Sequence, residues 1–201
     1  MPARPCGPAV LLAPGAGAGQ HHPFLAGVRA RLAAAGHPVL TFDYPYREAG
    51  RRAPDRPDVL AACHRAAAAR LRRYEPRIVL AGKSMGCRVA SHLAADGDPA
   101  VGLVCFGYPL VPVGKAEARP TDHLSAIDVP MLFLTGERDR LAPLDLLDPI
   151  VARLRWASLQ VIPDADHSFR TPKRAGVSED EMLDLLASAT VDWMAERGLR
   201  R

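Results

Sequence analysis

The chain has 201 residues, of which 48% are hydrophobic and 24% charged, and its formal net charge is +4. This length suits one well-buried domain, which we expect to span residues 1–201. The composition is typical of a globular protein, and no apolar run is long enough to predict a membrane span. The basic residues are scattered and lack interleaved aromatic side chains, which argues against a surface that binds nucleic acid.

The cysteine pattern and the N-terminal segment indicate the compartment. There is no C-x-x-C pair and no metal-like spacing with the histidines, so we expect reduced thiols at Cys6, Cys63, Cys87 and Cys105. The segment 1–8 makes a poor signal peptide, because the apolar run that follows it is short. We therefore expect a cytoplasmic protein that neither crosses nor binds a membrane.

Short apolar runs alternate with helical patterns along the whole chain. A strand at 10–13 and a glycine-rich loop precede a helix at 24–35, and a strand at 38–42 follows. We expect no regular structure at 47–56, and then a helix capped by Asp55 that runs to about Tyr74. Further strands are predicted at 78–81, 100–106, 130–135 and 158–162, with helices after residue 85, at 143–154 and at 178–197, and a short helix at 122–126. This alternation predicts an α/β fold with about six mostly parallel strands, helices on both faces and no lid.

The strand at 78–81 leads into the pentapeptide Gly82-Lys83-Ser84-Met85-Gly86, which matches G-x-S-x-G. A strand, a sharp turn and a helix in this order form a nucleophile elbow, which presents the serine at the edge of the sheet. A side chain at Gly82 or Gly86 would collide with the neighbouring strand or helix. Ser84 is therefore the predicted nucleophile.

A serine nucleophile needs a base and an orienting acid. His167 follows the last predicted strand and Asp139 follows the strand before it, which gives the order serine, acid, histidine. We predict Ser84, Asp139 and His167 as the catalytic residues, with three carboxylates as rivals for the acid: Glu137, Asp164 and Asp166. Cys87 lies one helical turn beyond Ser84 and is better explained as a packed thiol than as the nucleophile.

Backbone N–H groups should stabilise the oxyanion that forms when the serine attacks. We predict the N–H groups of Met85, after the nucleophile, and of Ala16, in the loop after the first strand. The alternative for that loop is nucleotide binding, but Gly15 to Gly19 fits neither common phosphate-binding motif. His21, His22 and His123 lack a carboxylate pattern for a metal, so we expect no metal there. Tyr44, Tyr108 and Pro109 follow strand ends and are candidate pocket residues, as is Tyr46, although core packing explains them nearly as well.

Several segments are similar to a known family: Leu11 to Gly19, Phe42 to Tyr46, Gly50 to Pro54, Phe106 to Leu110, Asp166 to Ser168, and the elbow itself. They resemble the small lid-less branch of the α/β-hydrolase superfamily that includes dienelactone-hydrolase-like and testis-expressed hydrolase-like proteins. Members of the branch often carry histidines where this chain has Pro14 and Val111. Dienelactone hydrolases have cysteine where this chain has Ser84, so their substrate is not implied.

The residues and the resemblance together predict a serine hydrolase, a carboxylesterase or acyl hydrolase acting on small substrates. No cofactor and no metal are expected, and the expected partner is a small-molecule acyl substrate. The choice between monomer and homodimer stays open. The alternative function is a non-catalytic or regulatory interaction module on an α/β-hydrolase fold.

Overall fold

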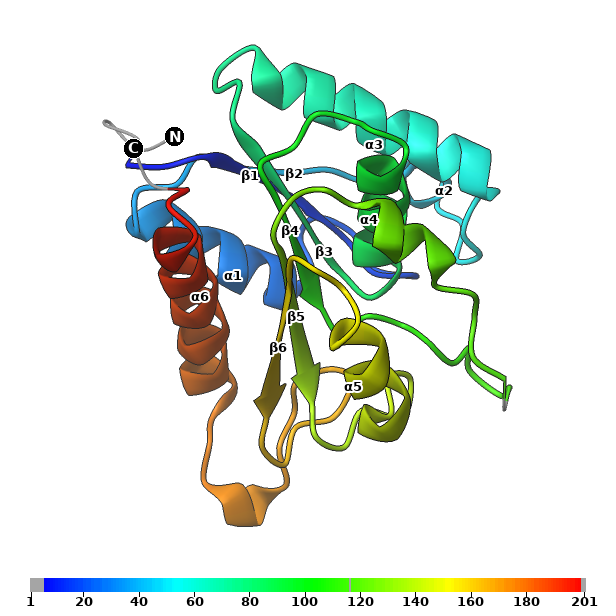
Figure 1. Ribbon diagram of the computed structural model, residues 1–201, viewed down its shortest axis with the longest axis vertical. Coiled ribbons are helices and arrows are strands. Elements are labelled where there is room, and N and C mark those ends of the chain that lie inside the picture. Colours follow the sequence, from blue (N-terminus) through cyan, green and yellow to red (C-terminus); the bar gives the residue numbers. More distant parts are fainter. Residues whose placement is uncertain (1–5, 116, 200–201) are drawn as a thin grey trace.

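The computed structural model describes residues 6–115 and 117–199. Strands and helices alternate along the chain (Figure 1). The strands are β1 (Ala9–Ala13), β2 (Val39–Thr41), β3 (Ile78–Lys83), β4 (Gly102–Phe106), β5 (Met131–Gly136) and β6 (Ala157–Ile162). The helices are α1 (Pro23–Ala34), α2 (Pro45–Glu48), α3 (Pro57–Arg72), α4 (Met85–Ala95), α5 (Leu144–Val151) and α6 (Glu179–Glu196), with short 3₁₀ helices η1 (Asp122–Ala126) and η2 (Lys173–Ala175).

All the strand pairs are parallel, and the six strands lie in the order β2-β1-β3-β4-β5-β6. The chain moves from β1 outward to β2 and then crosses back to place β3 on the other side of β1. The direction of winding therefore reverses between β1 and β3. In open parallel sheets, ligands bind beyond the carboxyl ends of the strands at such a reversal. The predicted nucleophile and the glycine-rich loop both follow these two strands.

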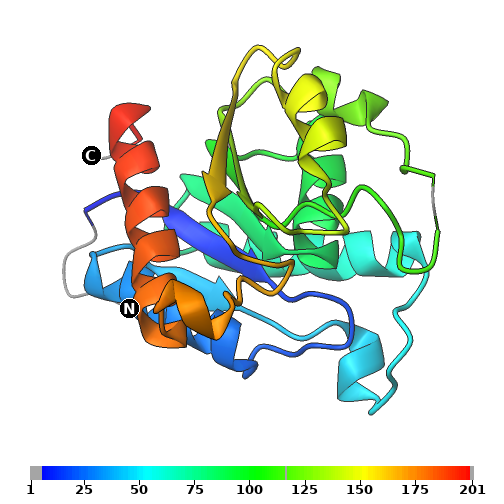
Figure 2. The same ribbon diagram turned by 90° about the horizontal axis from the view of Figure 1, so that it is seen from below.

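Helices cover both faces of the sheet, as the two views show (Figures 1 and 2). Successive residues of a strand point to opposite faces, so each central strand contributes to two cores. On one face Leu11 and Leu80 pack with residues of α3, α4 and α5. On the other face Val10 and Val79 pack with residues of α1 and α6. Burial on both faces explains why these strands are continuous apolar runs rather than alternating ones.

The segment predicted to be irregular differs from expectation at its start, where α2 forms. Pro45 occupies the first turn of α2, where its fixed φ suits a helix and its missing N–H removes no hydrogen bond. Asp55 does not cap α3, contrary to the sequence prediction, because its carboxylate accepts from the backbone N–H of Tyr46 at 2.8 Å and from Arg51 at 2.6 Å. Arg56 is the N-cap residue of α3 instead, and its side chain makes no capping hydrogen bond.

The final helix is stabilised at its start by a capping box. Ser178 is the N-cap residue of α6, and it forms a capping box with Glu181. The Glu181 carboxylate accepts from the backbone N–H of Ser178, and this hydrogen bond lowers the pKa of Glu181. Within residues 6–115 and 117–199, no helix has the length and apolar content needed to cross a membrane.

Candidate active site

Ser84 lies in the sharp turn between β3 and α4 and has φ 52° and ψ −117°. Positive φ is costly for a residue with a side chain, and such strain is typical of functional turns. Both elbow glycines allow neighbouring backbone segments to approach closely. A Cβ at Gly82 would overlap the backbone of Gly86 and Cys87, and one at Gly86 would lie 2.6 Å from the carbonyl oxygen of Ala13 in β1. The elbow therefore has the geometry that the motif predicts.

The structure brings the three predicted catalytic side chains together. His167 Nε2 lies 2.9 Å from Ser84 Oγ, and His167 Nδ1 lies 2.7 Å from Asp139 Oδ2. Because a carboxylate can only accept, Nδ1 carries the proton and Nε2 is free to accept the hydroxyl proton of Ser84. The side chain of Asp139 is fully buried, whereas that of His167 is 21% exposed. These three residues come from three separate strand ends, after β3, β5 and β6.

The second oxygen of Asp139 fixes the orientation of its carboxylate. Oδ1 accepts from the backbone N–H groups of Leu141 and Ala142 at 2.8 and 3.2 Å. The three rival carboxylates have other partners. Glu137 accepts from the N–H of Asp164 at 2.9 Å, Asp164 forms an ion pair with Arg174, and Asp166 accepts from the N–H groups of Ser168 and Arg170. Asp139 is the carboxylate that contacts the imidazole.

The two residues predicted to supply the oxyanion donors lie in the same pocket as Ser84. Ala16 and Met85 both line the pocket that contains Ser84. In residues 6–115 and 117–199, nothing accepts a hydrogen bond from the N–H of Ala16. The loop that carries Ala16 is held by a residue of α2, because the N–H of Gly17 donates to Tyr46 Oη at 3.0 Å. An N–H that is fixed but unpaired is suited to bind a developing negative charge.

Asp43 holds the far end of the same loop. Its Oδ1 accepts from the backbone N–H of Gln20 at 2.8 Å, and its Oδ2 accepts from the Gln20 side chain at 3.0 Å. A Cβ at Gly19 would lie 2.6 Å from Asp43 Oδ1, so only glycine leaves room for this contact. The sequence predicts no supporting role for Asp43 or Tyr46, although both lie in the segment Phe42 to Tyr46 that resembles the lid-less branch. The loop after β1 is thus held by side chains from the segment after β2.

A pocket of about 550 Å³ opens over Ser84 and His167. Its walls are mainly apolar, and its charged side chains are Lys83 and Arg119. Among its apolar lining residues are Leu25, Leu60, Met85, Pro109, Val111 and Val113. Pro109 lies where the sequence predicted it, and Val111 lines the pocket at the position where the similar branch often has histidine. The volume is within the range that holds small organic ligands.

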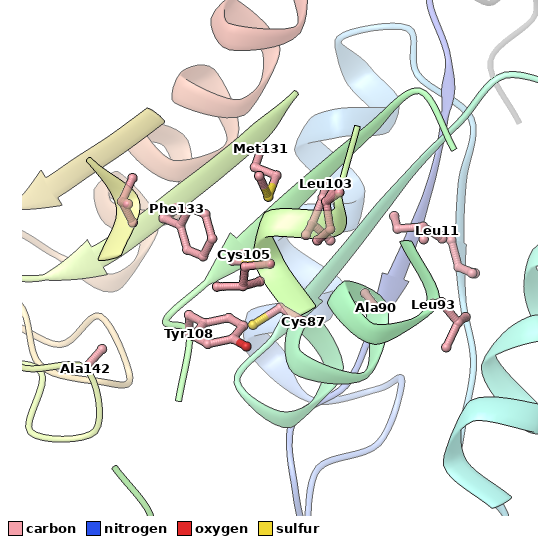
Figure 3. Packing of buried hydrophobic residues seen from close by; sticks show 14 of the residues in the cluster. Leu11, Cys87, Ala90, Leu93, Leu103, Cys105, Tyr108, Met131, Phe133 and Ala142 are labelled. Atoms are coloured by element: carbon pink, nitrogen blue, oxygen red, sulfur yellow. The ribbon is translucent and has the colours of Figure 1, made fainter. Parts of the chain in front are cut away.

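Tyr44 and Tyr108, predicted as candidate pocket residues, do not line this pocket. Tyr44 is fully buried, and its hydroxyl lies 3.2 Å from His64 Nδ1, where burial raises the pKa of the phenol. Tyr108 is 1% exposed and lies in the core beside Phe133 (Figure 3). Its hydroxyl accepts from the Arg88 guanidinium at 3.0 Å. Both tyrosines are core residues, which is the alternative that their positions in the sequence allow.

The other reactive side chains lie away from the reacting hydroxyl or have structural partners. The described residues contain no group of three or more His, Cys, Asp or Glu side chains placed to hold a metal ion. His22 lines the pocket, and His123 stacks on His92 at 3.7 Å between ring centroids. Cys87 is buried in the core, and its thiol donates to the carbonyl of Ser84 at 3.0 Å.

Comparison with known proteins identifies the family and the fold. A family model described as an alpha/beta hydrolase domain matches residues 7–195. An alpha-beta serine hydrolase homologue from Coxiella burnetii has a TM-score of 0.71 at 15% identity, over 94% of this chain and 88% of that chain. A serine hydrolase without lid from Xanthomonas campestris has a TM-score of 0.70 at 22% identity, over 96% and 85% of the two chains.

A dienelactone hydrolase from Anabaena variabilis has a TM-score of 0.71 at 21% identity, over 98% of this chain and 89% of that chain. At these identities the structural likeness concerns the fold. The fold and its lid-less form agree with the sequence prediction. Because the family match extends over nearly the whole chain, the protein belongs to the alpha/beta hydrolase domain family.

Proposed function

We propose that this protein is a serine hydrolase, a carboxylesterase or acyl hydrolase that acts on small substrates. One observation carries the proposal: Ser84, His167 and Asp139 form a continuous hydrogen-bonded chain with distances of 2.9 and 2.7 Å. A serine hydroxyl with such a base and acid is an activated nucleophile. The solved relatives described as serine hydrolases support the same reaction class.

The proposed reaction follows from the roles of these groups. Ser84 Oγ attacks the carbonyl carbon of the substrate while His167 Nε2 takes the hydroxyl proton. The N–H groups of Ala16 and Met85 stabilise the negative oxygen. The imidazolium then gives its proton to the leaving alcohol, and a water molecule repeats the sequence to release the acid. Asp139 holds the imidazole in the tautomer that makes both transfers work.

The pocket supports small, partly apolar acyl groups. Its volume of about 550 Å³ and its apolar walls leave room for a short acyl chain or a single ring, and the lid-less form leaves its mouth open. A non-catalytic interaction module, the alternative from the sequence, would not require an ordered base and acid on Ser84. The hydrogen-bonded chain therefore favours the enzyme.

Hydrolysis of a series of p-nitrophenyl esters with increasing acyl length tests the proposal. We expect turnover that is highest for short chains and that falls at least about 10⁴-fold in Ser84→Ala. Ser125→Ala is the matched control, because Ser125 is exposed on η1 and its hydroxyl donates only to the carbonyl of Asp122. Equal rates for wild type and Ser84→Ala would reject the assignment of the nucleophile.

A further inference from the structure

Lys83, the residue directly before the nucleophile, is a half-buried cation at the edge of the pocket. In the strand β3 it follows Val79 and Ala81 on the face that packs against α1 and α6. Across residues 6–115 and 117–199, no Asp or Glu oxygen lies within ion-pair distance of Lys83 Nζ. Neither the proposed nucleophile nor the oxyanion site requires a lysine at this position, so its contacts need another explanation.

The ammonium of Lys83 joins three segments of the chain. Nζ donates to the backbone carbonyl oxygen of His167 at 2.6 Å, and this hydrogen bond joins the end of β3 to the loop after β6. It also lies 5.4 Å from the ring centre of Phe169 and 6.0 Å from that of Phe24 in α1, both within the range of cation–π attraction. The two rings stack on each other at 5.8 Å. The cation thus lies where the elbow, α1 and the histidine loop meet.

The backbone around this contact is shaped to allow it. Gly107 has φ +69°, and a Cβ there would lie 3.1 Å from Lys83 Nζ and 3.2 Å from His167 Cε1. Phe169 has φ +60°, a strained conformation for an aromatic residue that persists only where its surroundings hold it. The contact therefore depends on a glycine on one side and on a strained phenylalanine on the other.

The surroundings of Lys83 act on its charge in both directions. Burial lowers the pKa of Lys83 to about 8, although Cys87, Asp139 and Asp166 act in the opposite direction. The ammonium is therefore easier to deprotonate than a lysine in water. Its hydrogen bond and its two ring contacts favour the charged form at this place.

We propose that Lys83 is a positioning residue that fixes the backbone of His167 relative to Ser84 and so keeps Nε2 within reach of the nucleophile. The imidazole is held by Asp139 at one nitrogen, and Lys83 holds the backbone from which the ring projects. Since residues 83 and 84 are adjacent, the same turn carries the nucleophile and the group that positions its base. The role in catalysis rests on the hydrolase function proposed above.

The Lys83→Met variant tests this role, because methionine retains most of the apolar stem and removes the donor and the charge. We expect kcat to fall about 10- to 100-fold, as for small misplacements of a catalytic group, while KM stays within about twofold. The melting temperature should stay close to that of the wild type, because methionine keeps the apolar stem in place. Hydrogen exchange of the amides at 166–170 should become faster, with no change elsewhere in the sheet.

Two further variants complete the experiment. Lys83→Arg keeps a cation and a donor, so it should retain more of the wild-type kcat than Lys83→Met. Lys173→Met is the matched control, because Lys173 is exposed on η2 and contacts neither Ser84 nor His167. It should match the wild type in kcat, melting temperature and exchange.

The outcomes distinguish this proposal from the proposed function. A wild-type kcat in Lys83→Met would overturn the positioning role, and so would a kcat loss that comes with a lower melting temperature and faster exchange throughout. If the wild type hydrolyses no ester, the hydrolase function fails, but the exchange measurement still applies. Unchanged exchange at 166–170 in Lys83→Met would then show that Lys83 does not hold this loop.

Discussion

The Asp139→Asn substitution would exchange one atom of a buried side chain whose two oxygens have different partners. Oδ1 accepts from the N–H groups of Leu141 and Ala142, and Oδ2 accepts from His167 Nδ1. An asparagine must keep its carbonyl oxygen toward the two backbone donors, because an NH₂ group there would leave donors facing donors. Its NH₂ group then faces His167 Nδ1 and forces that nitrogen to accept. The imidazole proton moves to Nε2.

With its proton on Nε2, the imidazole cannot take the proton of Ser84. We therefore expect kcat to fall about 10⁴-fold, as in other triads where this acid becomes an amide. At about 1.36 kcal/mol per factor of ten, this loss raises the activation free energy by about 5.5 kcal/mol. The fold should persist, because the N–H groups of Leu141 and Ala142 keep their acceptor.

The assay is steady-state hydrolysis of p-nitrophenyl acetate at pH 7.5, with the melting temperature measured in parallel. Asp148→Asn makes the same chemical change at an exposed position on α5 and should behave like the wild type. If Asp139→Asn kept more than about a tenth of the wild-type kcat in a folded protein, Asp139 would not set the tautomer of His167.

Three other predictions follow from the same contacts. Since His167 must be neutral to accept a proton, kcat/KM for a p-nitrophenyl ester should fall as the pH is lowered from 8 to 5, and a flat profile would contradict its role as base. Tyr46→Phe removes the acceptor for the N–H of Gly17, so urea unfolding should show a loss of about 1 kcal/mol and kcat should fall by a few fold; unchanged values would mean that the loop does not need this bond. Burial lowers the pKa of His64 to about 3. Between pH 6.5 and 3 the unfolded chain therefore binds a proton that the folded chain does not, and the free energy of unfolding should decrease by up to about 1.4 kcal/mol for each unit by which the pH is lowered. His64→Leu should lack that part of the slope in urea unfolding at pH 4 to 7, and equal slopes would count against the burial effect.

The sequence predicts well those parts of the fold that depend on residues close together in the chain. Buried parallel strands are continuous apolar runs, and the turn at Ser84 requires glycines on both sides, so β3, the elbow and α4 can be recognised locally. The order of Ser84, Asp139 and His167 at successive strand ends is also local information. Parallel strands then bring those ends to one edge of the sheet, which is why three residues far apart in the sequence could be grouped.

The parts that the sequence does not predict depend on which way a side chain turns. Tyr44 and Tyr108 follow strand ends, but that position does not say whether the ring enters the pocket or the core. Gly107 turns the chain at φ +69° just before Tyr108, and the Tyr108 ring packs on Phe133. Its hydroxyl contacts Arg88, one helical turn beyond the elbow, and His123 in η1.

Lys83 shows the same limit in a different form. In the sequence it is the first variable position of G-x-S-x-G, and the motif does not indicate its contacts. These contacts form only when α1 brings Phe24 and the loop after β6 brings His167 and Phe169 to the same place. The supporting contacts of Asp43 and Tyr46 to the loop after β1 are likewise formed between segments, so the local sequence does not show them.

The most direct test of the proposed activity is covalent labelling by a fluorophosphonate, which reacts with an activated serine. Intact-mass measurement of the wild type should show a single adduct, and peptide mapping should place it on Ser84. Ser84→Ala should show no adduct, while Ser125→Ala should label like the wild type. Failure of the folded wild-type protein to react, or an adduct that persists in Ser84→Ala, would contradict the account of Ser84 as a nucleophile activated by His167 and Asp139.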